Sequence, residues 1–410
     1  MPERVIDIYL GEHPVHVGTA FFHGNGARLR TTFTYATSWL SAVDSFALAP
    51  SVPLSASSVQ CASLPGFLSD AAPDRWGRHL IFRGVQNVAE TSSGAMRSLD
   101  DVDYLLGVDD WARMGALRLS REGGETFLGM GTDVPKIVRL PELLGAARSV
   151  DIGSDEWQQV KTLLDAGSSS LGGARPKATV EDDGLLWLAK FPSLRDEWDV
   201  MAWEAWAVEM AGRCGVRVPH HRTLRVGDHT VFLSQRFDRQ PGSRVPYLSA
   251  LAALDMPDGA VADYLDLADV LQSISDSPSD DLVELFRRMV FSIAIHNTDD
   301  HLRNHGLLRV SRGWRLSPAF DLNPNPFSNE ERALLIMGTG NIADETKALV
   351  SFAEAVGLSR QLSRSIVREV LAQMRGWQVV AKRLGCPQRE VSLFAPIIQK
   401  CCDALAEHSA

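Results

Sequence analysis

The feature that most constrains this chain is a polar segment placed directly behind a strongly apolar helix pattern. From residue 281 to 296, apolar residues recur at helical spacing, which predicts a helix with a broad buried face. The segment 297–304, Asn-Thr-Asp-Asp-His-Leu-Arg-Asn, interrupts this pattern. Two short strands are predicted after it, at 306–310 and 314–316. This polar segment is the most informative candidate for a functional site in the chain.

The spacing of three oxygen-bearing side chains here predicts a phosphate-transfer site. Asp299 and Asn304 lie five positions apart, and Asp321, in Pro-Ala-Phe-Asp, follows seventeen residues after Asn304. Phosphotransferases of the protein-kinase type need a loop carboxylate, an amide oxygen five residues later and a second carboxylate behind a hairpin. Asp299 would orient or deprotonate the attacking hydroxyl. Asn304 and Asp321 would hold Mg²⁺ against the phosphates of ATP, because Mg²⁺ prefers hard oxygen ligands.

Residues upstream complete this inventory. A loop with Gly172, Gly173 and Lys177 precedes a predicted hairpin, and its N–H groups can be brought onto phosphate oxygens. Lys190 lies on the second strand of that hairpin, where a kinase lysine contacts phosphate and pairs with a helix glutamate. The loop and Lys190 are therefore expected to bind the nucleotide.

Two further elements belong to the expected ATP site. Glu197 and Glu204 fall in the helix pattern that follows Lys190, and we favour Glu197 as the partner of this lysine. On a later predicted strand, backbone groups near Gln235 and Phe237 are expected to contact adenine as a hinge.

Composition restricts the other possibilities. The chain has 410 residues, with 41 basic and 51 acidic side chains, and a net charge of −10 disfavours broad nucleic-acid binding. Its five cysteines are scattered without a Cys-x-x-Cys pair, which indicates reduced thiols in a cytoplasmic protein. The first residues lack the apolar core of a signal peptide, and prolines interrupt the uncharged stretch 45–69, so no membrane segment is expected.

The predicted elements follow one another in the order of an α+β protein. Strands at 4–10 and 15–22 open the chain, and a helix follows Asp74, which can cap its first turn. The pattern is helical from 141 to 166, and then gives two strands joined by Asp-Asp-Gly, a helix and another strand. Beyond about residue 245 the chain is mainly helical, after a junction at Gln-Pro-Gly-Ser.

Six segments together make the sequence similar to one known family. They are Asp-Ala-Ala-Pro-Asp-Arg-Trp-Gly-Arg (70–78), Ser-Leu-Gly-Gly-Ala-Arg-Pro-Lys (170–177), Leu-Ala-Lys-Phe-Pro (188–192), Gln-Arg-Phe-Asp-Arg (235–239), Asn-Thr-Asp-Asp-His-Leu-Arg-Asn (297–304) and Pro-Ala-Phe-Asp-Leu (318–322). In this order they resemble the HipA family, the serine/threonine kinases and toxins of bacterial type II toxin–antitoxin pairs. The resemblance spans nearly the whole chain, and the ordered set is far more specific than any single motif.

The resemblance implies a protein-kinase-like two-lobe fold of the α+β class, with an N-terminal β-rich subdomain and a mainly α-helical C-terminal lobe. The expected domains are an N-terminal subdomain at 1–130, an α/β region with the glycine loop at 131–243, similar to a kinase N-lobe, and an all-α catalytic lobe at 244–410. The sequence departs from ordinary protein kinases, because it has no His-Arg-Asp, no Asp-Phe-Gly and no three-glycine loop. Nothing that depends on an activation segment is therefore transferred.

The resemblance also implies roles for individual residues. A catalytic base, two magnesium ligands and a phosphate-binding lysine are expected at Asp299, at Asn304 with Asp321, and at Lys190. Family members autophosphorylate a serine of the glycine loop, which switches the kinase off, and Ser170 matches that position. His301 and Arg303 are expected to support the catalytic loop.

Cofactors and partners follow from the same resemblance. It implies ATP and Mg²⁺ as cofactors, and a HipB-like helix-turn-helix antitoxin as a partner, so that DNA is contacted only through the antitoxin. The expected substrate is a protein serine or threonine in the translation machinery, such as an aminoacyl-tRNA synthetase or another translation factor.

Four other interpretations are considered. The chain could be a binding protein that acts as a corepressor with the antitoxin and whose kinase site has decayed. His301 and His305, four positions apart, could be metal ligands of a hydrolase. The sequence 338–343 formally fits a dinucleotide-binding turn, but the helical pattern after it disfavours that use. The basic stretch 359–383 has a solvated surface as its ordinary explanation, and contact with DNA or an acidic surface, when a DNA-binding partner is present, as the alternative.

Overall fold

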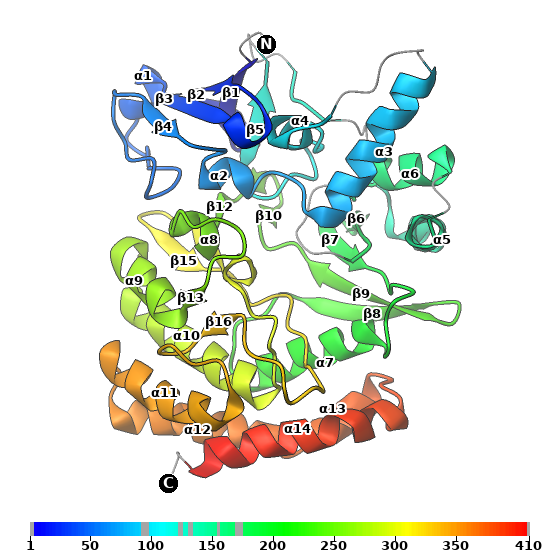
Figure 1. Cartoon of the computed structure of the whole chain (residues 1–410), viewed down its shortest axis with the longest axis vertical. Helices are drawn as coiled ribbons and strands as arrows, with labels where there is room; N and C mark the ends of the chain where they lie inside the picture. Colours follow the sequence, from blue (N-terminus) through cyan, green and yellow to red (C-terminus); the bar gives the residue numbers. More distant parts are fainter. Residues whose placement is uncertain are drawn as a thin grey trace. The chain divides into compact units, whose positions relative to one another are not determined.

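The computed structural model describes residues 4–91, 98–121, 126–129, 134–153, 156–168 and 175–407. The chain divides into two compact units, whose elements are labelled in Figure 1. Unit 1 consists of Met1–Arg195 and Gln235–Leu248, and unit 2 consists of Asp196–Ser234 and Ser249–Ala410.

Unit 1 opens with a five-stranded antiparallel sheet in the order β4-β3-β2-β1-β5. Its strands are β1 (Arg4–Leu10), β2 (Val15–His23), β3 (Arg30–Tyr35), β4 (Val59–Cys61) and β5 (Leu117–Ser120). Side chains along β1 alternate between buried and partly exposed, so Ile6 and Ile8 join Phe22 and Phe33 in the core. The first two strands confirm the predicted opening hairpin.

Unit 1 also contains helices. They are α1 (Thr37–Leu40), α2 (Gly66–Ser69), α3 (Arg75–Thr91), α4 (Asp101–Leu106), α5 (Leu140–Asp151) and α6 (Trp157–Asp165), with 3₁₀ turns η1 (Gly26–Arg28) and η2 (Ile137–Arg139). As predicted, Asp74 caps α3, because its Oδ1 accepts a 2.7 Å hydrogen bond from the backbone N–H of Gly77. The pattern predicted as one helical stretch at 141–166 forms two helices, α5 and α6, which pack on each other.

The predicted hairpin behind the glycine loop consists of β6 (Lys177–Asp182) and β7 (Leu185–Lys190). Asp183 and Gly184 both have positive φ, 50° and 76°, which is the geometry of the tight turn that an Asp-Gly sequence favours. The register of the two strands pairs Lys177 with Lys190, so the two lysines stand opposite each other at the open end of the hairpin.

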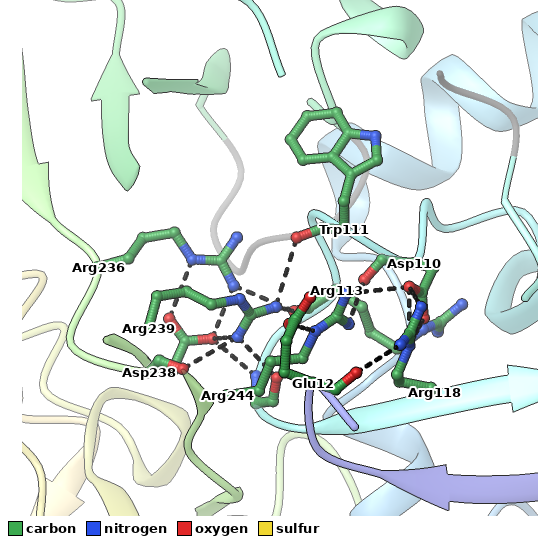
Figure 2. Close-up of polar contacts among 10 residues, drawn as sticks. Glu12, Asp110, Trp111, Arg113, Arg118, Arg236, Asp238, Arg239 and Arg244 are labelled. Atoms are coloured by element: carbon green, nitrogen blue, oxygen red, sulfur yellow. Dashed lines mark hydrogen bonds and ion pairs between the residues drawn. The ribbon is translucent and has the colours of Figure 1, made fainter. Parts of the chain in front are cut away.

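A buried cluster of arginines and carboxylates anchors the segment 235–248 within unit 1 (Figure 2). Asp238 lies between Arg236 and Arg239, at 2.6 Å and 2.8 Å, and also accepts a 2.8 Å hydrogen bond from the backbone N–H of Gly115. Arg236 donates to the carbonyl of Ala112 at 2.7 Å. The bonds to Gly115 and Ala112 join residues that are more than a hundred positions apart in the sequence.

The same cluster continues through Arg244, on the short hairpin of β10 (Arg239–Gln240) and β11 (Ser243–Arg244). Arg244 pairs with Glu12 and with Asp110, each at 3.0 Å, and Asp110 also binds Arg118 at 2.7 Å. The segment is therefore fixed to the turn after β1 and to the residues before β5.

Unit 2 is mainly helical. Its helices are α7 (Val200–Arg213), α8 (Ala250–Ala253), α9 (Tyr264–Ile274), α10 (Pro278–Ala294), α11 (Ile342–Ala355), α12 (Arg360–Met374), α13 (Trp377–Arg383) and α14 (Gln388–Glu407), with the 3₁₀ turn η3 (Leu302–Asn304). Helix α10 packs against α9, α11, α12 and α14 and is the centre of the core, as its apolar pattern predicts (Figure 1). Ring contacts attach α7 to this core, Trp203 with Phe394 at 4.1 Å and Trp206 with Trp377 at 5.5 Å.

Short strands complete unit 2. They are the hairpin β8 (His221–Val226) and β9 (His229–Gln235), the parallel pair β13 (Ala262–Asp263) and β16 (Leu334–Leu335), and the hairpin β14 (Gly306–Arg309) and β15 (Trp314–Leu316). The strand β12 (Tyr247–Ser249) falls where the chain passes between the units. The helix, polar loop and hairpin predicted from 281 to 316 are confirmed as α10, a loop containing η3, and β14–β15. Among the described residues, no helix is both long enough and apolar enough to cross a membrane.

Candidate active site

The loop between α10 and β14 holds Asp299 and Asn304 in a fixed relation. The Nδ2 of Asn304 donates a 3.0 Å hydrogen bond to the backbone carbonyl of Asp299. This bond closes residues 299–304 into a turn. It leaves the amide oxygen of Asn304 for another partner. The carboxyl group of Asp299 is exposed, whereas the residues on both sides of it are buried. One carboxylate is thus presented to solvent from an otherwise buried loop.

The electrostatic surroundings of Asp299 include the other predicted carboxylate. The protein atoms around Asp299 raise the pKa of its carboxyl group by desolvation, although the side chain keeps contact with solvent. His301 opposes this effect, and the negative charge of Asp321 adds to it. The fold therefore brings Asp299 and Asp321 close enough to repel each other, and a bound cation would relieve that repulsion.

Asp321 has an unusual backbone conformation. Its φ is 58°, in the left-handed region that residues other than glycine rarely adopt. The segment before it is held by the backbone N–H of Ala319, which donates to the carbonyl of Arg217 at 2.7 Å. Phe320 and Leu322, on either side of Asp321, line a small cavity together with Asn304. Asp321 thus lies beside the loop, in a strained geometry of the kind that occurs at functional sites.

The donor set of this site fits Mg²⁺. The carboxylate of Asp321 and the amide oxygen of Asn304 are hard ligands, and Mg²⁺ in phosphotransferases takes only one or two protein carboxylates, its other ligands being water and phosphate oxygens. In the part of the chain that the structure describes, no group of three or more His, Cys, Asp and Glu side chains could hold a metal ion. His305 is buried, with its Nε2 3.0 Å from Asp300 Oδ1. The histidine-based metal site is therefore not supported.

His301 and Arg303 both act on the loop. His301 lowers the pKa of Asp299, the effect described above. Arg303 forms a two-pronged ion pair with Asp258, with distances of 2.6 Å and 2.8 Å. The supporting role of both residues stays a prediction.

In unit 1, the two lysines of the hairpin are buried. Lys190 ends β7 and is 8% exposed, while Lys177 begins β6 and is 1% exposed. The ammonium group of Lys177 is bound by Oδ2 of Asp74, the residue that also caps α3. In this structure a carboxylate therefore holds Lys177, which differs from the expectation of a lysine presented to phosphate.

The expected hinge residues alternate with the buried cluster of Figure 2. Arg236 and Asp238, which belong to this cluster, are buried. Gln235, directly before Arg236, and Phe237, between Arg236 and Asp238, are partly exposed. The backbone N–H of Arg236 donates to the carbonyl of Leu186 at 2.9 Å. The segment is thus rigidly held, and contact of its backbone with adenine stays a prediction.

The preference for Glu197 rests on a helix boundary that is wrong. Helix α7 begins at Val200, because the side chain of Asp199 caps it through a 3.1 Å hydrogen bond from the N–H of Ala202. Glu197 precedes the helix and is exposed, whereas Glu204 lies inside α7 and is 2% exposed. Of the two glutamates, only Glu204 therefore lies within the helix.

Three other predicted residues, Ser170, Gly172 and Gly173, lie outside the described residues. Asp300, a residue that its sequence pattern did not identify, is 4% exposed and is bound by Tyr264 of α9, Ser292 of α10 and His305. Its only signal in the sequence is that it directly follows Asp299.

Comparisons with known proteins identify the family of the chain. The model of the HipA-like C-terminal domain matches residues 169–377, and the model of the HipA N-terminal domain matches residues 6–119. The chain belongs to the HipA family. No curated protein matches the chain.

Among solved structures, this HipA-family chain is similar to a chain of the complex of HipA and HipB from the toxin–antitoxin system of Shewanella oneidensis MR-1 with operator DNA. The TM-score is 0.66 at 15% identity, and the match covers 98% of this chain and 97% of the other. A second match is the proinflammatory kinase CtkA of Helicobacter pylori, with a TM-score of 0.44 at 13% identity, covering 58% and 93%. The first match shows that the two chains share a fold over their whole lengths.

Proposed function

We propose that this HipA-family protein is an ATP- and Mg²⁺-dependent serine/threonine-protein kinase of a toxin–antitoxin module. The observation that carries the proposal is the gathering of Asp299, Asn304 and Asp321 in unit 2, with the electrostatic effect of Asp321 on Asp299. Membership of the HipA family supports the same activity.

Each residue has a distinct task in this proposal. The exposed carboxylate of Asp299 orients the substrate hydroxyl and takes its proton as the oxygen attacks the γ-phosphorus. Asn304 and Asp321 supply the oxygen ligands for Mg²⁺, which neutralises charge on the phosphates when bound. The bond from the γ-phosphorus to the leaving ADP oxygen then breaks.

The nucleotide-binding half of the proposal is assigned to unit 1. Lys190 contacts the phosphates of ATP. The glycine loop with Gly172 and Gly173 covers the phosphates, and backbone groups near Gln235 and Phe237 bind adenine. Ser170 is the proposed site of autophosphorylation, which would switch the kinase off.

The proposed partners follow from the family. A HipB-like antitoxin would bind this chain, since the similar chain of Shewanella oneidensis belongs to a HipA–HipB–operator complex. DNA contact through the antitoxin, a substrate in the translation machinery and a cytoplasmic location belong to the same proposal.

The test is transfer of ³²P from [γ-³²P]ATP to protein, with wild type and Asp299→Ala. Loss of the base is expected to lower transfer by about 10²–10⁴-fold. Asp269→Asn is the control, because Asp269 is an exposed aspartate on α9 of the same unit. Transfer at the wild-type rate by Asp299→Ala would remove the mechanism, and no transfer by wild type would favour the decayed corepressor.

A further inference from the structure

We propose that Asp300 is the positioning residue of the active-site loop: a buried carboxylate that fixes the backbone from which Asp299 and Asn304 project. The inference rests on the proposed kinase function. It assigns to Asp300 and its partners the positioning of Asp299 and Asn304, not a part in the reaction itself.

The carboxylate of Asp300 is held from three directions. Its Oδ2 accepts hydrogen bonds from the hydroxyl of Tyr264 and, at 2.9 Å, from that of Ser292, while its Oδ1 lies 3.0 Å from Nε2 of His305. All four residues are buried. Burial alone would raise the pKa of Asp300, but His305, Tyr264 and Arg332 hold it below the usual range of a carboxyl group. The group is therefore a buried anion, not a neutral acid.

The three partners come from different elements of unit 2. Tyr264 is the first residue of α9, whose start is fixed by a capping box between Asp263 and Asp266. Ser292 lies in the last turns of α10, and His305 closes the loop directly before β14. One carboxylate thus joins two helices of the core to the end of the loop.

A buried arginine joins the same network at the start of the loop. Nη1 of Arg332 donates to the hydroxyl of Ser292 at 2.8 Å and to the carbonyl of Asn297 at 2.7 Å. Its Nε binds Glu345 of α11 at 2.7 Å. Asn297, Asp300 and His305 are therefore all anchored, and Asp299 and Asn304 sit between anchored points.

The surroundings of Asp300 leave no room for a ligand. The cavity beside it, lined by Ser292, Asp300, Asn304 and His305, has about 10 Å³ of free space, the size that one water molecule needs. This space admits a water molecule but not a nucleotide. The role that the contacts of Asp300 support is to fix the positions of its neighbours in the loop.

The expected consequence of loosening the network is a loss of turnover. A displacement of about 1 Å in a catalytic group can cost about a hundredfold in rate. Tyr264→Phe removes one hydrogen bond to Asp300 and keeps the ring packing. Asp300→Asn removes the charge and keeps the shape. We expect kcat to fall about 10–100-fold, in the range of supporting partners of metal ligands, while the KM for ATP changes little.

The experiment measures kcat, KM for ATP and amide hydrogen exchange of residues 297–305 in wild type, Tyr264→Phe and Asp300→Asn. Tyr35→Phe is the matched control, because Tyr35 is also a buried tyrosine whose hydroxyl donates, to the carbonyl of Val52 at 2.7 Å, but it lies in the sheet of unit 1. The proposal expects faster exchange in the loop and a lower kcat for both loop variants, and neither change for Tyr35→Phe.

The outcomes separate this proposal from the kinase assignment. Wild-type turnover and exchange in Tyr264→Phe would overturn the role of Asp300 and leave the kinase standing. An equal loss of kcat in Tyr35→Phe would overturn it too, because the effect would then be general destabilisation. If wild type transfers no phosphate, the kinase assignment fails, and loop exchange alone decides whether Asp300 anchors residues 297–305.

Discussion

Asp299 and Asp300 are neighbours in the sequence with opposite environments. The carboxylate of Asp299 is exposed and repelled by Asp321, whereas that of Asp300 is buried and bound by hydroxyl groups and His305. One carboxylate therefore faces the solvent while the other faces the core. A reacting carboxylate and an anchoring carboxylate can thus occupy adjacent positions.

The pKa of Asp299 gives a prediction at this scale. It lies above the ordinary value of 3.8, and Asp321 contributes to the shift. Asp321→Asn removes a negative charge and should lower the pKa of Asp299, whereas His301→Gln removes an opposing effect and should raise it. A carboxyl ¹³C NMR titration of the protein without nucleotide measures both, with Asp269→Asn as the control.

The upward shift in the pKa of Asp299 has a consequence for activity. A base works only when deprotonated, so turnover is lost as the pH falls through the pKa of Asp299, which is higher than that of an ordinary aspartate. The two variants should displace the NMR titration in opposite directions. A shift in the same direction for both would contradict the placement of Asp321 and His301 around Asp299.

Individual residues also show what the sequence could and could not predict. Asp299, Asn304 and Asp321 are recognisable because their spacing along the chain matches a known chemical inventory. Asp300 is not, because its partners Tyr264 and Arg332 join it only in the folded unit. The prediction that Glu197 lies in the helix was wrong, because the side chain of Asp199 caps α7 and the helix begins only at Val200.

At the scale of elements, local sequence patterns predicted most of the helices and strands that carry the site residues. Helix α10, the hairpin β14–β15 and the hairpin β6–β7 follow from apolar periodicity and from a turn sequence with positive φ. The anchoring of residues 235–248 did not follow, because its bonds reach residues such as Ala112 and Gly115, more than a hundred positions away. Contacts between residues so distant in the sequence leave no local pattern.

The buried cluster of Figure 2 gives a prediction for this segment. Asp238→Asn leaves Arg236 and Arg239 without their shared carboxylate in a buried place, and breaking such a pair costs about 3–5 kcal/mol in free energy of unfolding. Urea unfolding at neutral pH measures this. Asp228→Asn, an exposed aspartate in the turn between β8 and β9, should change the free energy by less than about 0.5 kcal/mol.

The contribution of Asp238 also depends on pH. Burial would raise its pKa, but Arg236, Arg239 and the N–H of Gly115 lower it from 3.8 to about 2. The carboxylate therefore stabilises the folded state fully above the unfolded pKa, and this contribution is lost as the pH falls toward about 2. The difference between wild type and Asp238→Asn should narrow over that range. A difference that stays constant between pH 5 and pH 2 would contradict the account.

At the scale of the whole molecule, a family fold persists with little sequence identity. The match to the Shewanella oneidensis chain covers 98% of this chain at 15% identity, and the family models match both its N-terminal and its C-terminal parts. Cores tolerate extensive replacement of apolar residues when volume and pattern are kept, whereas a reacting group must keep its chemical type. The few polar motifs therefore carry most of the information about function.

The most direct test of the central claim is a crystal structure of the full chain with Mg²⁺ and the non-hydrolysable analogue AMP-PNP. Our account predicts a metal ion bound by Asn304 and Asp321, the γ-phosphate facing Asp299, and Lys190 in contact with the phosphates. A nucleotide bound elsewhere, or one bound with no metal at Asn304 and Asp321, would contradict it.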